Sequence, residues 1–194
     1  MDVGAGDGRF ALARAAEHPE ELVLAVDASH AAMRESSWRA GRSARRGGLP
    51  NALFVASSLE QLPGELSATA SLVTVHFPWG SLLDAAIGRD PAGMDRLGSL
   101  VAQGGSLRLL VSAAERDATR GATVLDPGAV ADAYAARGFA AESCRPATLA
   151  DAEAARSSWG RRLLTAAAGE RRAWLIDLRR VESGGGGALH RLRT

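Results

Sequence analysis

The chain has 194 residues, of which 46% are hydrophobic and 23% are charged, with a formal net charge of +1. This balance excludes a disordered or collagen-like chain, and the length suits one domain with a sizeable core. No apolar run approaches the roughly 20 residues of a transmembrane helix, and the first residues lack the pattern of a signal peptide. The single cysteine, Cys144, excludes an internal disulfide. We therefore expect a cytoplasmic protein with no membrane partner.

All 23 basic residues are arginines, so arginine abundance by itself does not indicate an RNA partner. Their placement is more informative. Arginines gather in residues 34–46 and 156–193, with Trp38 in the first stretch and Trp159 and Trp174 in the second. These stretches are either solvated surfaces or contacts with nucleic acid.

Apolar runs alternate with helical patterns along the chain, which predicts an α/β sheet with crossover helices. The expected strands are one ending at Val3, then 22–26, 52–56, 71–75, 106–112, 139–144 and 173–181. The expected helices are 9–17, 29–46, 81–87, 95–102 and 126–137. Two connections, 113–125 and 145–172, are longer than a compact domain needs, and such connections are usually functional or disordered.

The sequence predicts one domain over residues 1–183 and a flexible glycine-rich tail over 184–194. The first strand has only two or three residues, whereas a central strand normally has about five or six. Two interpretations remain open: the true start lies upstream, or the chain is a truncated copy.

Alternate glycines follow the first strand in the pattern Asp2-x-Gly4-x-Gly6-x-Gly8. Glycine permits positive φ and lets a ligand approach the backbone, and the following helix offers free N–H groups. Dinucleotide-binding folds use G-x-G-x-x-G, whose third glycine would fall at Arg9 here, so the pattern disfavours a nicotinamide cofactor.

This turn resembles motif I of the class I S-adenosylmethionine-dependent methyltransferases. The resemblance implies that Asp2 lies near the methionine amino group of the cofactor and that the glycines pass its methionyl and ribose moieties. Asp27, at the end of the second strand, stands where that family binds the ribose hydroxyls. The alternative is a turn that only connects a strand to a helix.

Three further segments narrow the resemblance. They are S-L-E-Q-L-P at 58–63, H-F-P-W-G-S-L-L at 76–83 and S-S-W-G-R-R-L at 157–163. Together with the glycine turn, they resemble the aminoglycoside-resistance methyltransferases that modify N1 of an adenine in the decoding site of 16S ribosomal RNA. The resemblance implies a class I methyltransferase fold, which is Rossmann-like, with a seven-stranded, mostly parallel sheet whose last strand is antiparallel.

The resemblance also implies which residues bind S-adenosylmethionine. Leu59 and Glu60 would border its adenine, and Ser81 would lie close to it. His76 would line the methyl-transfer pocket, at a position where the family usually has an aliphatic residue. With those named above, the expected cofactor-binding set is Asp2, Gly4, Gly6, Asp27, Leu59, Glu60, His76 and Ser81. No metal is expected.

The remaining roles concern the RNA. Trp79 and Trp159 would sandwich the flipped target adenine, because a base in a helix must be extruded before its Watson–Crick edge can react. Four arginines would contact RNA: Arg161 and Arg162 at the phosphates beside the flipped nucleotide, and Arg116 and Arg120 in the connection 113–125.

The resemblance therefore predicts methyl transfer from S-adenosylmethionine to N1 of the decoding-site adenine, which would confer aminoglycoside resistance. The expected substrate is 16S rRNA within the assembled 30S subunit, and the expected enzyme is a monomer. Two alternatives remain: a methyltransferase that acts on another base or a small molecule, and a truncated, inactive RNA-binding paralogue.

Overall fold

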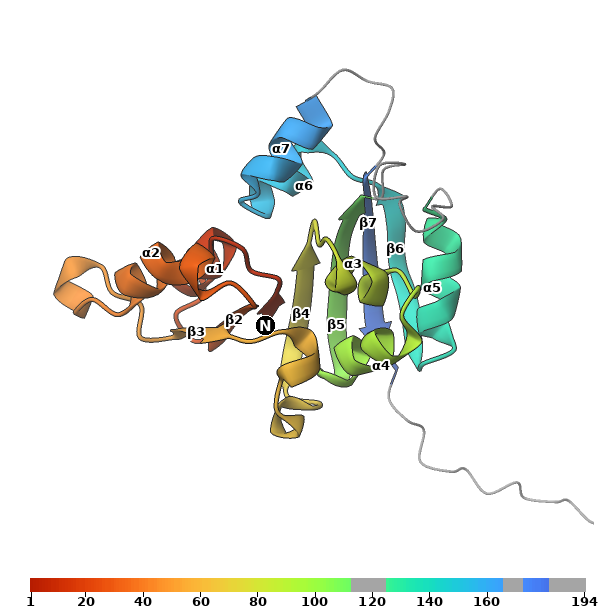
Figure 1. Ribbon diagram of the computed structural model, residues 1–194, viewed down its shortest axis with the longest axis horizontal. Coiled ribbons are helices and arrows are strands. Elements are labelled where there is room, and N and C mark those ends of the chain that lie inside the picture. Colours follow the sequence, from red (N-terminus) through yellow and green to blue (C-terminus); the bar gives the residue numbers. More distant parts are fainter. Residues whose placement is uncertain (113–124, 166–172, 182–194) are drawn as a thin grey trace, which may run out of the picture.

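The computed structural model describes residues 1–112, 125–165 and 173–181, and these form one seven-stranded sheet with helices around it (Figure 1). The spatial order of the strands is β3-β2-β1-β4-β5-β7-β6. All neighbours pair in parallel except β7, which is antiparallel to both β5 and β6. The predicted fold class is thus confirmed. The strands are β1 Asp2–Val3, β2 Val23–Asp27, β3 Ala52–Ala56, β4 Ala70–His76, β5 Val101–Ser112, β6 Phe139–Pro146 and β7 Ala173–Arg180.

The helices lie around the sheet (Figure 1). Helices α6 and α7 pack on each other above the carboxyl ends of β4 and β5 (Figure 1). The helices are α1 Arg9–Glu17, α2 His30–Ala40, α3 Ser81–Ala86, α4 Pro91–Ser99, α5 Pro127–Ala135, α6 Leu149–Ala154 and α7 Ser158–Thr165. Within the described ranges, none of them has both the length and the apolar character needed to cross a bilayer.

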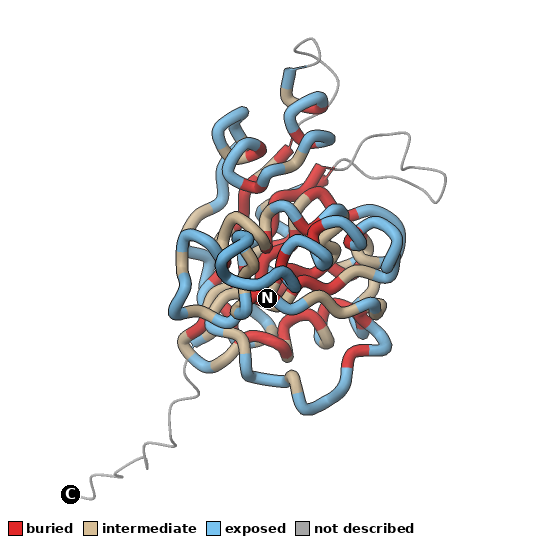
Figure 2. The backbone as a smooth tube through the Cα atoms, turned by 90° about the vertical axis from the view of Figure 1, so that its left-hand side faces the viewer, coloured by how far each residue is buried: buried red, intermediate tan, exposed pale blue. Residues whose placement is uncertain are grey.

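The core follows the central strands, because a parallel strand covered on both faces must be apolar throughout. Val73 and Val75 of β4 and Leu107 and Leu109 of β5 are fully buried. Figure 2 shows the buried residues running through the middle of the molecule, with exposed residues on the surrounding helices and loops. This rigid centre fixes the strand ends, where parallel sheets place their ligands.

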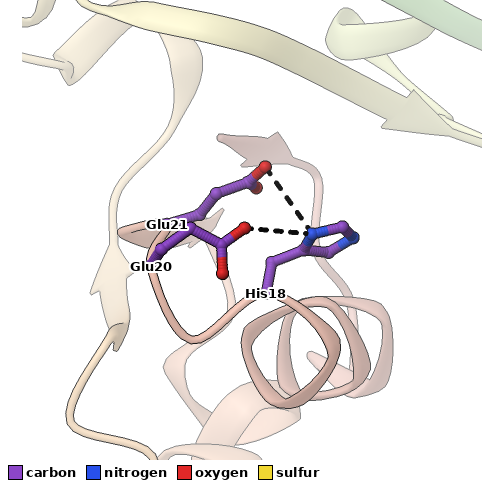
Figure 3. Close-up of side chains that lie close together, drawn as sticks. All are labelled: His18, Glu20 and Glu21. Atoms are coloured by element: carbon purple, nitrogen blue, oxygen red, sulfur yellow. Dashed lines mark ion pairs between the residues drawn. The ribbon is translucent and has the colours of Figure 1, made fainter.

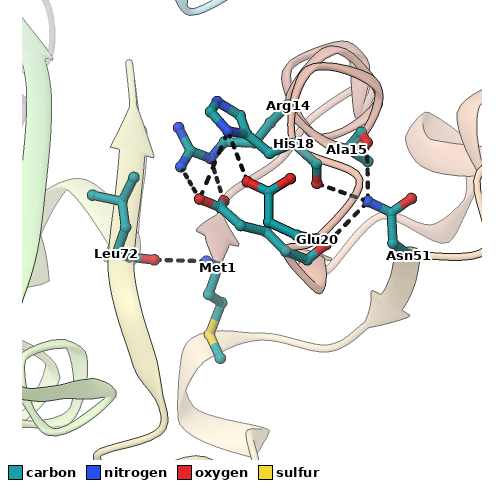
Figure 4. Close-up of polar contacts among 8 residues, drawn as sticks. Met1, Arg14, Ala15, His18, Glu20, Asn51 and Leu72 are labelled. Atoms are coloured by element: carbon teal, nitrogen blue, oxygen red, sulfur yellow. Dashed lines mark hydrogen bonds and ion pairs between the residues drawn. The ribbon is translucent and has the colours of Figure 1, made fainter.

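The first strand has two residues, Asp2 and Val3, which pair with Ala25 and Val26 of β2. On the other side, the Met1 backbone nitrogen donates to the Leu72 carbonyl at 2.7 Å (Figure 4). Asp2 is therefore held between two longer strands, and the short strand still delivers its carboxylate to the sheet centre.

Several predicted boundaries were wrong. Helix α2 ends at Ala40, whose carbonyl accepts from Leu49 as the chain turns toward β3. Helix α4 begins at Pro91, in place of residue 95. Strand β5 begins at Val101 and runs through the two glycines that were expected to precede it, with irregular pairing to β4 between Ala70 and Leu72.

The sequence predicted no helix in the connection 145–172, but it contains helices α6 and α7. A capping box begins α6: the Thr148 hydroxyl accepts from Asp151 N, and the Asp151 carboxylate accepts from Thr148 N. Arg145 also donates two hydrogen bonds to that carboxylate, both at 2.8 Å. These bonds fix where α6 starts beyond β6. The other long connection, with Arg116 and Arg120, and the tail 184–194 lie outside the described residues.

Candidate active site

A cavity of about 550 Å³ opens at the carboxyl ends of the parallel strands. Three parts of the chain form it: the turn after β1 with the start of α1, the end of β4, and the segment that joins α6 to α7. Its lining residues are Asp2, Ala5, Gly6, Asp7, Phe10, His76, Phe77, Trp79, Ala155, Arg156, Ser157, Ser158 and Trp159. Segments far apart in the sequence therefore line one pocket.

The glycine turn has the backbone conformation that its sequence predicts. Gly4, Gly6 and Gly8 all have positive φ, at 77°, 56° and 73°. A Cβ on Gly6 would meet nothing within 4 Å, whereas Gly8 packs against the Phe54 ring. Gly6 therefore presents bare backbone to the cavity, which suits close approach of a ligand.

Asp27 at the end of β2 holds this turn in place. Its Oδ2 accepts from the Gly6 backbone and its Oδ1 from the Ser29 backbone, both at 2.8 Å. Asp27 itself does not line the cavity. Each carboxylate oxygen retains further acceptor capacity for a ligand hydroxyl.

A polar group is buried at the floor of the cavity. Asp2 Oδ1 accepts from the Thr74 hydroxyl at 2.8 Å and lies 3.6 Å from His76 Nδ1. Burial raises the pKa of the Asp2 carboxyl, and the neighbouring His76 and Thr74 oppose that shift. Burial also lowers the pKa of the His76 imidazole, against the pull of Asp2. The edge of the His76 ring meets Phe10 with the centroids 4.5 Å apart.

Two tryptophans stand at the cavity with much of their surface in solvent. Trp79 is 86% exposed and Trp159 is 47% exposed, although large aromatic side chains usually bury most of their surface. Phe77 lies between the strand end and α7: its ring meets Trp159 edge to face at 5.5 Å, and Gly160 packs directly against it. Phe77 has φ 49°, which is unusual for a residue with a side chain. The residue that follows β4 thus packs directly against α7.

The structure brings together five of the predicted site residues, namely Asp2, Gly6, His76, Trp79 and Trp159. The other five cofactor candidates do not line the cavity: Gly4, Asp27, Leu59, Glu60 and Ser81. Leu59 is buried in the main core. Hydrogen bonds from Ser58, from its own backbone amide and from Ser81 lower the pKa of Glu60.

Arg161 and Arg162 are exposed on α7, next to Trp159 in the sequence. Arg156, named above only as part of the arginine-rich stretch 156–193, also lines the cavity; it has φ 52° and pairs with Glu17 of α1 at 3.3 Å. Phe10 and Phe77 were also missed as lining residues, although Phe10 lies in the first turn of the helix that follows the glycine turn. Cys144, the single cysteine, is exposed on β6.

A separate polar group lies where α1 ends, with His18 Nδ1 near the carboxylates of Glu20 and Glu21 (Figure 3). The Arg14 guanidinium already binds Glu21 through two hydrogen bonds, at 2.9 and 2.7 Å. The Asn51 amide lies within hydrogen-bond distance of three nearby carbonyls (Figure 4). These contacts tie α1 to the start of β3 and explain the group as an ion-pair network.

Comparison with known proteins gives a consistent result. A family model described as "NpmA: 16S rRNA (adenine(1408)-N(1))-methyltransferase" matches residues 1–177. A protein of that name from Streptoalloteichus hindustanus is 32% identical over 173 residues, which cover 84% of this chain and 79% of that protein. Another from Escherichia coli is 32% identical over 87 residues, which cover 45% and 40%.

Solved structures agree with these matches. A variant of the 16S rRNA (adenine(1408)-N(1))-methyltransferase from Catenulisporales acidiphilia, solved with cosubstrate SAM, superposes with a TM-score of 0.80 at 29% identity. That match covers 96% of this chain and 87% of the other. The 16S rRNA methyltransferase KamB gives 0.79 at 27% identity, covering 93% and 86%. An enzyme solved as the aminoglycoside resistance methyltransferase NpmB1 gives 0.75 at 30% identity, covering 93% and 85%.

Proposed function

The chain belongs to the 16S rRNA (adenine(1408)-N(1))-methyltransferase family, and we infer that it transfers a methyl group from S-adenosylmethionine to N1 of that decoding-site adenine, conferring aminoglycoside resistance. One observation carries the assignment of the site. The glycine turn, a buried carboxylate and two exposed tryptophans line a single cavity at the carboxyl ends of the parallel strands. This is where an open α/β sheet places its ligands.

The cofactor end of the cavity fits S-adenosylmethionine. Gly6 leaves an open stretch of backbone, and Asp2 supplies a buried carboxylate whose described contacts both fall on Oδ1. We assign Asp2 to the cationic amino group of the cofactor and Gly4 and Gly6 to its methionyl and ribose moieties. Asp27 would bind the ribose hydroxyls from its fixed position behind the turn. Leu59, Glu60 and Ser81 would border the adenine, next to the cavity rather than within it.

The other end of the cavity fits a flipped base. Trp79 comes from the loop after β4 and Trp159 from α7, and both expose aromatic surface. Stacking on an aromatic side chain is worth about 1–3 kcal/mol per base, which offsets much of the cost of unstacking the nucleotide. Arg161 and Arg162 would bind the phosphates beside that base, since arginine matches phosphate geometry.

The main contribution of the protein to the reaction would be to position the two reactants. S-adenosylmethionine supplies an activated methyl group when it is bound. Adenine N1 carries an in-plane lone pair, so no general base has to remove a proton before that nitrogen attacks. Trp79 and Trp159 would fix the plane of the ring, and Asp2 would fix the far end of the cofactor. The rate enhancement would then come from orientation.

The form of the RNA that the enzyme recognises depends on the surface that the RNA presents. So small a protein recognises one base most readily on a preformed RNA surface, because RNA is read largely through shape and unstacked bases. We therefore propose that the substrate is 16S rRNA folded in the 30S subunit, and that the enzyme acts as a monomer in the cytoplasm.

The test is incubation of the protein with purified 30S subunits and labelled methyl donor, followed by primer extension along 16S rRNA. The expected result is one new stop at the decoding-site adenine, with weaker incorporation into protein-free 16S rRNA. A stop at another base would contradict the assigned substrate. Cofactor binding by calorimetry without any incorporation would favour an inactive paralogue.

A further inference from the structure

We propose that Asp2 and His76 take up one proton between them and that this proton competes with the cationic amino group of S-adenosylmethionine. His76 would then set the pH range in which the cofactor binds. The inference rests on the proposed function, because it takes that amino group as the partner of Asp2. His76 acts here through Asp2, as a positioning residue.

The geometry places the two side chains in one buried group. His76 Nδ1 lies 3.6 Å from Asp2 Oδ1, within ion-pair range but longer than a hydrogen bond. Their side chains are 9% and 4% exposed, so little water screens the interaction. Both residues line the cavity, and the Thr74 hydroxyl already donates to the same Oδ1. A ligand cation and a His76 proton would therefore act on one carboxylate.

The charge of the pair follows from its protonation. With His76 neutral and Asp2 ionised the pair carries one negative charge, and after uptake of one proton it carries none, whichever residue holds the proton. Burial disfavours each charged form, which raises the pKa of Asp2 and lowers that of His76. A bound cation compensates the buried carboxylate, so cofactor binding and loss of the proton favour each other.

Other charges face this pair from several elements. Arg108 of β5 lowers the pKa of His76, while Asp27 of β2 raises that of Asp2 and the Met1 amino group lowers it. Arg156 lines the same cavity from the segment before α7. From α1 the contact is the uncharged ring of Phe10. Burial lowers the pKa of the Met1 amino group, which brings its titration toward that of the pair, and the His76 variants below tell the two apart.

The experiment measures ligand affinity by calorimetry from pH 5.5 to 8.5. S-Adenosylhomocysteine carries the amino group and 5′-methylthioadenosine lacks it, so the two ligands separate the Asp2 contact from the rest of the site. Below a midpoint, the affinity for S-adenosylhomocysteine should fall about tenfold per pH unit, as for one competing proton. The affinity for 5′-methylthioadenosine should stay constant.

Two variants assign the proton. His76→Gln keeps a polar side chain without titration in this range, and His76→Leu replaces it with an aliphatic one. Both should move the midpoint to lower pH, whereas Phe10→Leu, which keeps an apolar side chain against the imidazole, should leave it in place. An unchanged midpoint in His76→Gln would overturn the inference. Circular dichroism at each pH confirms that the variants are folded.

The wild-type protein supplies an independent readout if the variants misfold. Calorimetry in buffers with different protonation enthalpies should show release of about one proton per S-adenosylhomocysteine below the midpoint. Binding without proton release contradicts the inference but leaves the proposed function intact. Failure to bind S-adenosylhomocysteine at every pH contradicts both.

Discussion

The Phe77 ring meets the Trp159 ring edge to face, with the centroids 5.5 Å apart and the planes at 67°. Phe77 directly follows β4, and Trp159 is the second residue of α7, more than 80 positions later in the chain. This pair joins the rigid sheet to the helix pair that closes the cavity. Gly160 makes the approach possible, because its backbone lies directly against the Phe77 ring.

Gly160→Ala should displace α7, since the new methyl group would overlap the Phe77 ring. Overpacking of this kind costs about 1–3 kcal/mol, and methylation of 30S subunits should fall further than S-adenosylmethionine affinity. Urea denaturation and calorimetry measure the two effects. The double variant with Phe77→Leu should recover part of the loss, because the smaller side chain relieves the overlap. A Gly160→Ala enzyme with full activity would refute this packing argument.

Trp159→Ala should reduce methylation severely while cofactor affinity stays nearly unchanged. Loss of about 1–3 kcal/mol of stacking corresponds to roughly 5- to 150-fold in rate. Single-turnover methylation of 30S subunits gives the rate, and calorimetry gives the affinity. Trp159→Phe is the matched control, and it should retain much of the activity because it keeps an aromatic face. A large loss of cofactor affinity in Trp159→Ala would count against the stacking role.

Arg162→Ala should weaken binding to 30S subunits and make that binding less sensitive to salt. Removal of one phosphate contact lowers the slope of log affinity against log salt by about 1, so the loss is largest at low salt. Arg179→Ala is the charge-matched control. Arg179 lies at the end of β7 that is distant from the cavity, where it pairs with Glu142 of β6. Equal salt slopes for wild type and Arg162→Ala would exclude the phosphate contact.

Asp151 should stabilise the fold only while it is ionised. Hydrogen bonds from Arg145 and Thr148 hold the pKa of its carboxyl well below the usual value. This stabilisation is therefore present above the ordinary aspartate pKa and is lost as the pH falls below it. Thr148→Ala, which removes the helix cap, should cost about 1 kcal/mol at pH 7. Denaturation of wild type and Asp151→Asn at pH 7 and pH 3 checks the sign, and the gap between them should narrow at pH 3.

The sequence predicted the parts of the fold that depend on local pattern. The buried strand Val23–Asp27 is an apolar run that ends in an aspartate, and the glycine turn needs positive φ at fixed positions. Helix α6 was missed although the capping pair Thr148 and Asp151 marks its start. The start of β5 was wrong because the chain already pairs with β4 at Val101, before an irregularity that contains Gly104 and Gly105 and ends where regular pairing resumes at Ser106.

Only the site residues that belong to short sequence motifs could be predicted. Asp2, Trp79 and Trp159 were identified from short strings, and the structure brings them to one cavity. The contacts of Phe77 with Gly160 and of Arg156 with Glu17 join residues far apart in the chain, so neither has a local signature. Long-range packing decides such contacts.

The position of β7 between β5 and β6 has a consequence for the order of assembly during synthesis. A ribosome makes β5 and β6 first, yet these two strands do not pair with each other and must wait for the strand between them. The cavity likewise needs Trp159, which emerges long after Asp2. A growing chain therefore cannot complete its sheet or its pocket until almost all of it has left the ribosome, the particle that carries its substrate RNA.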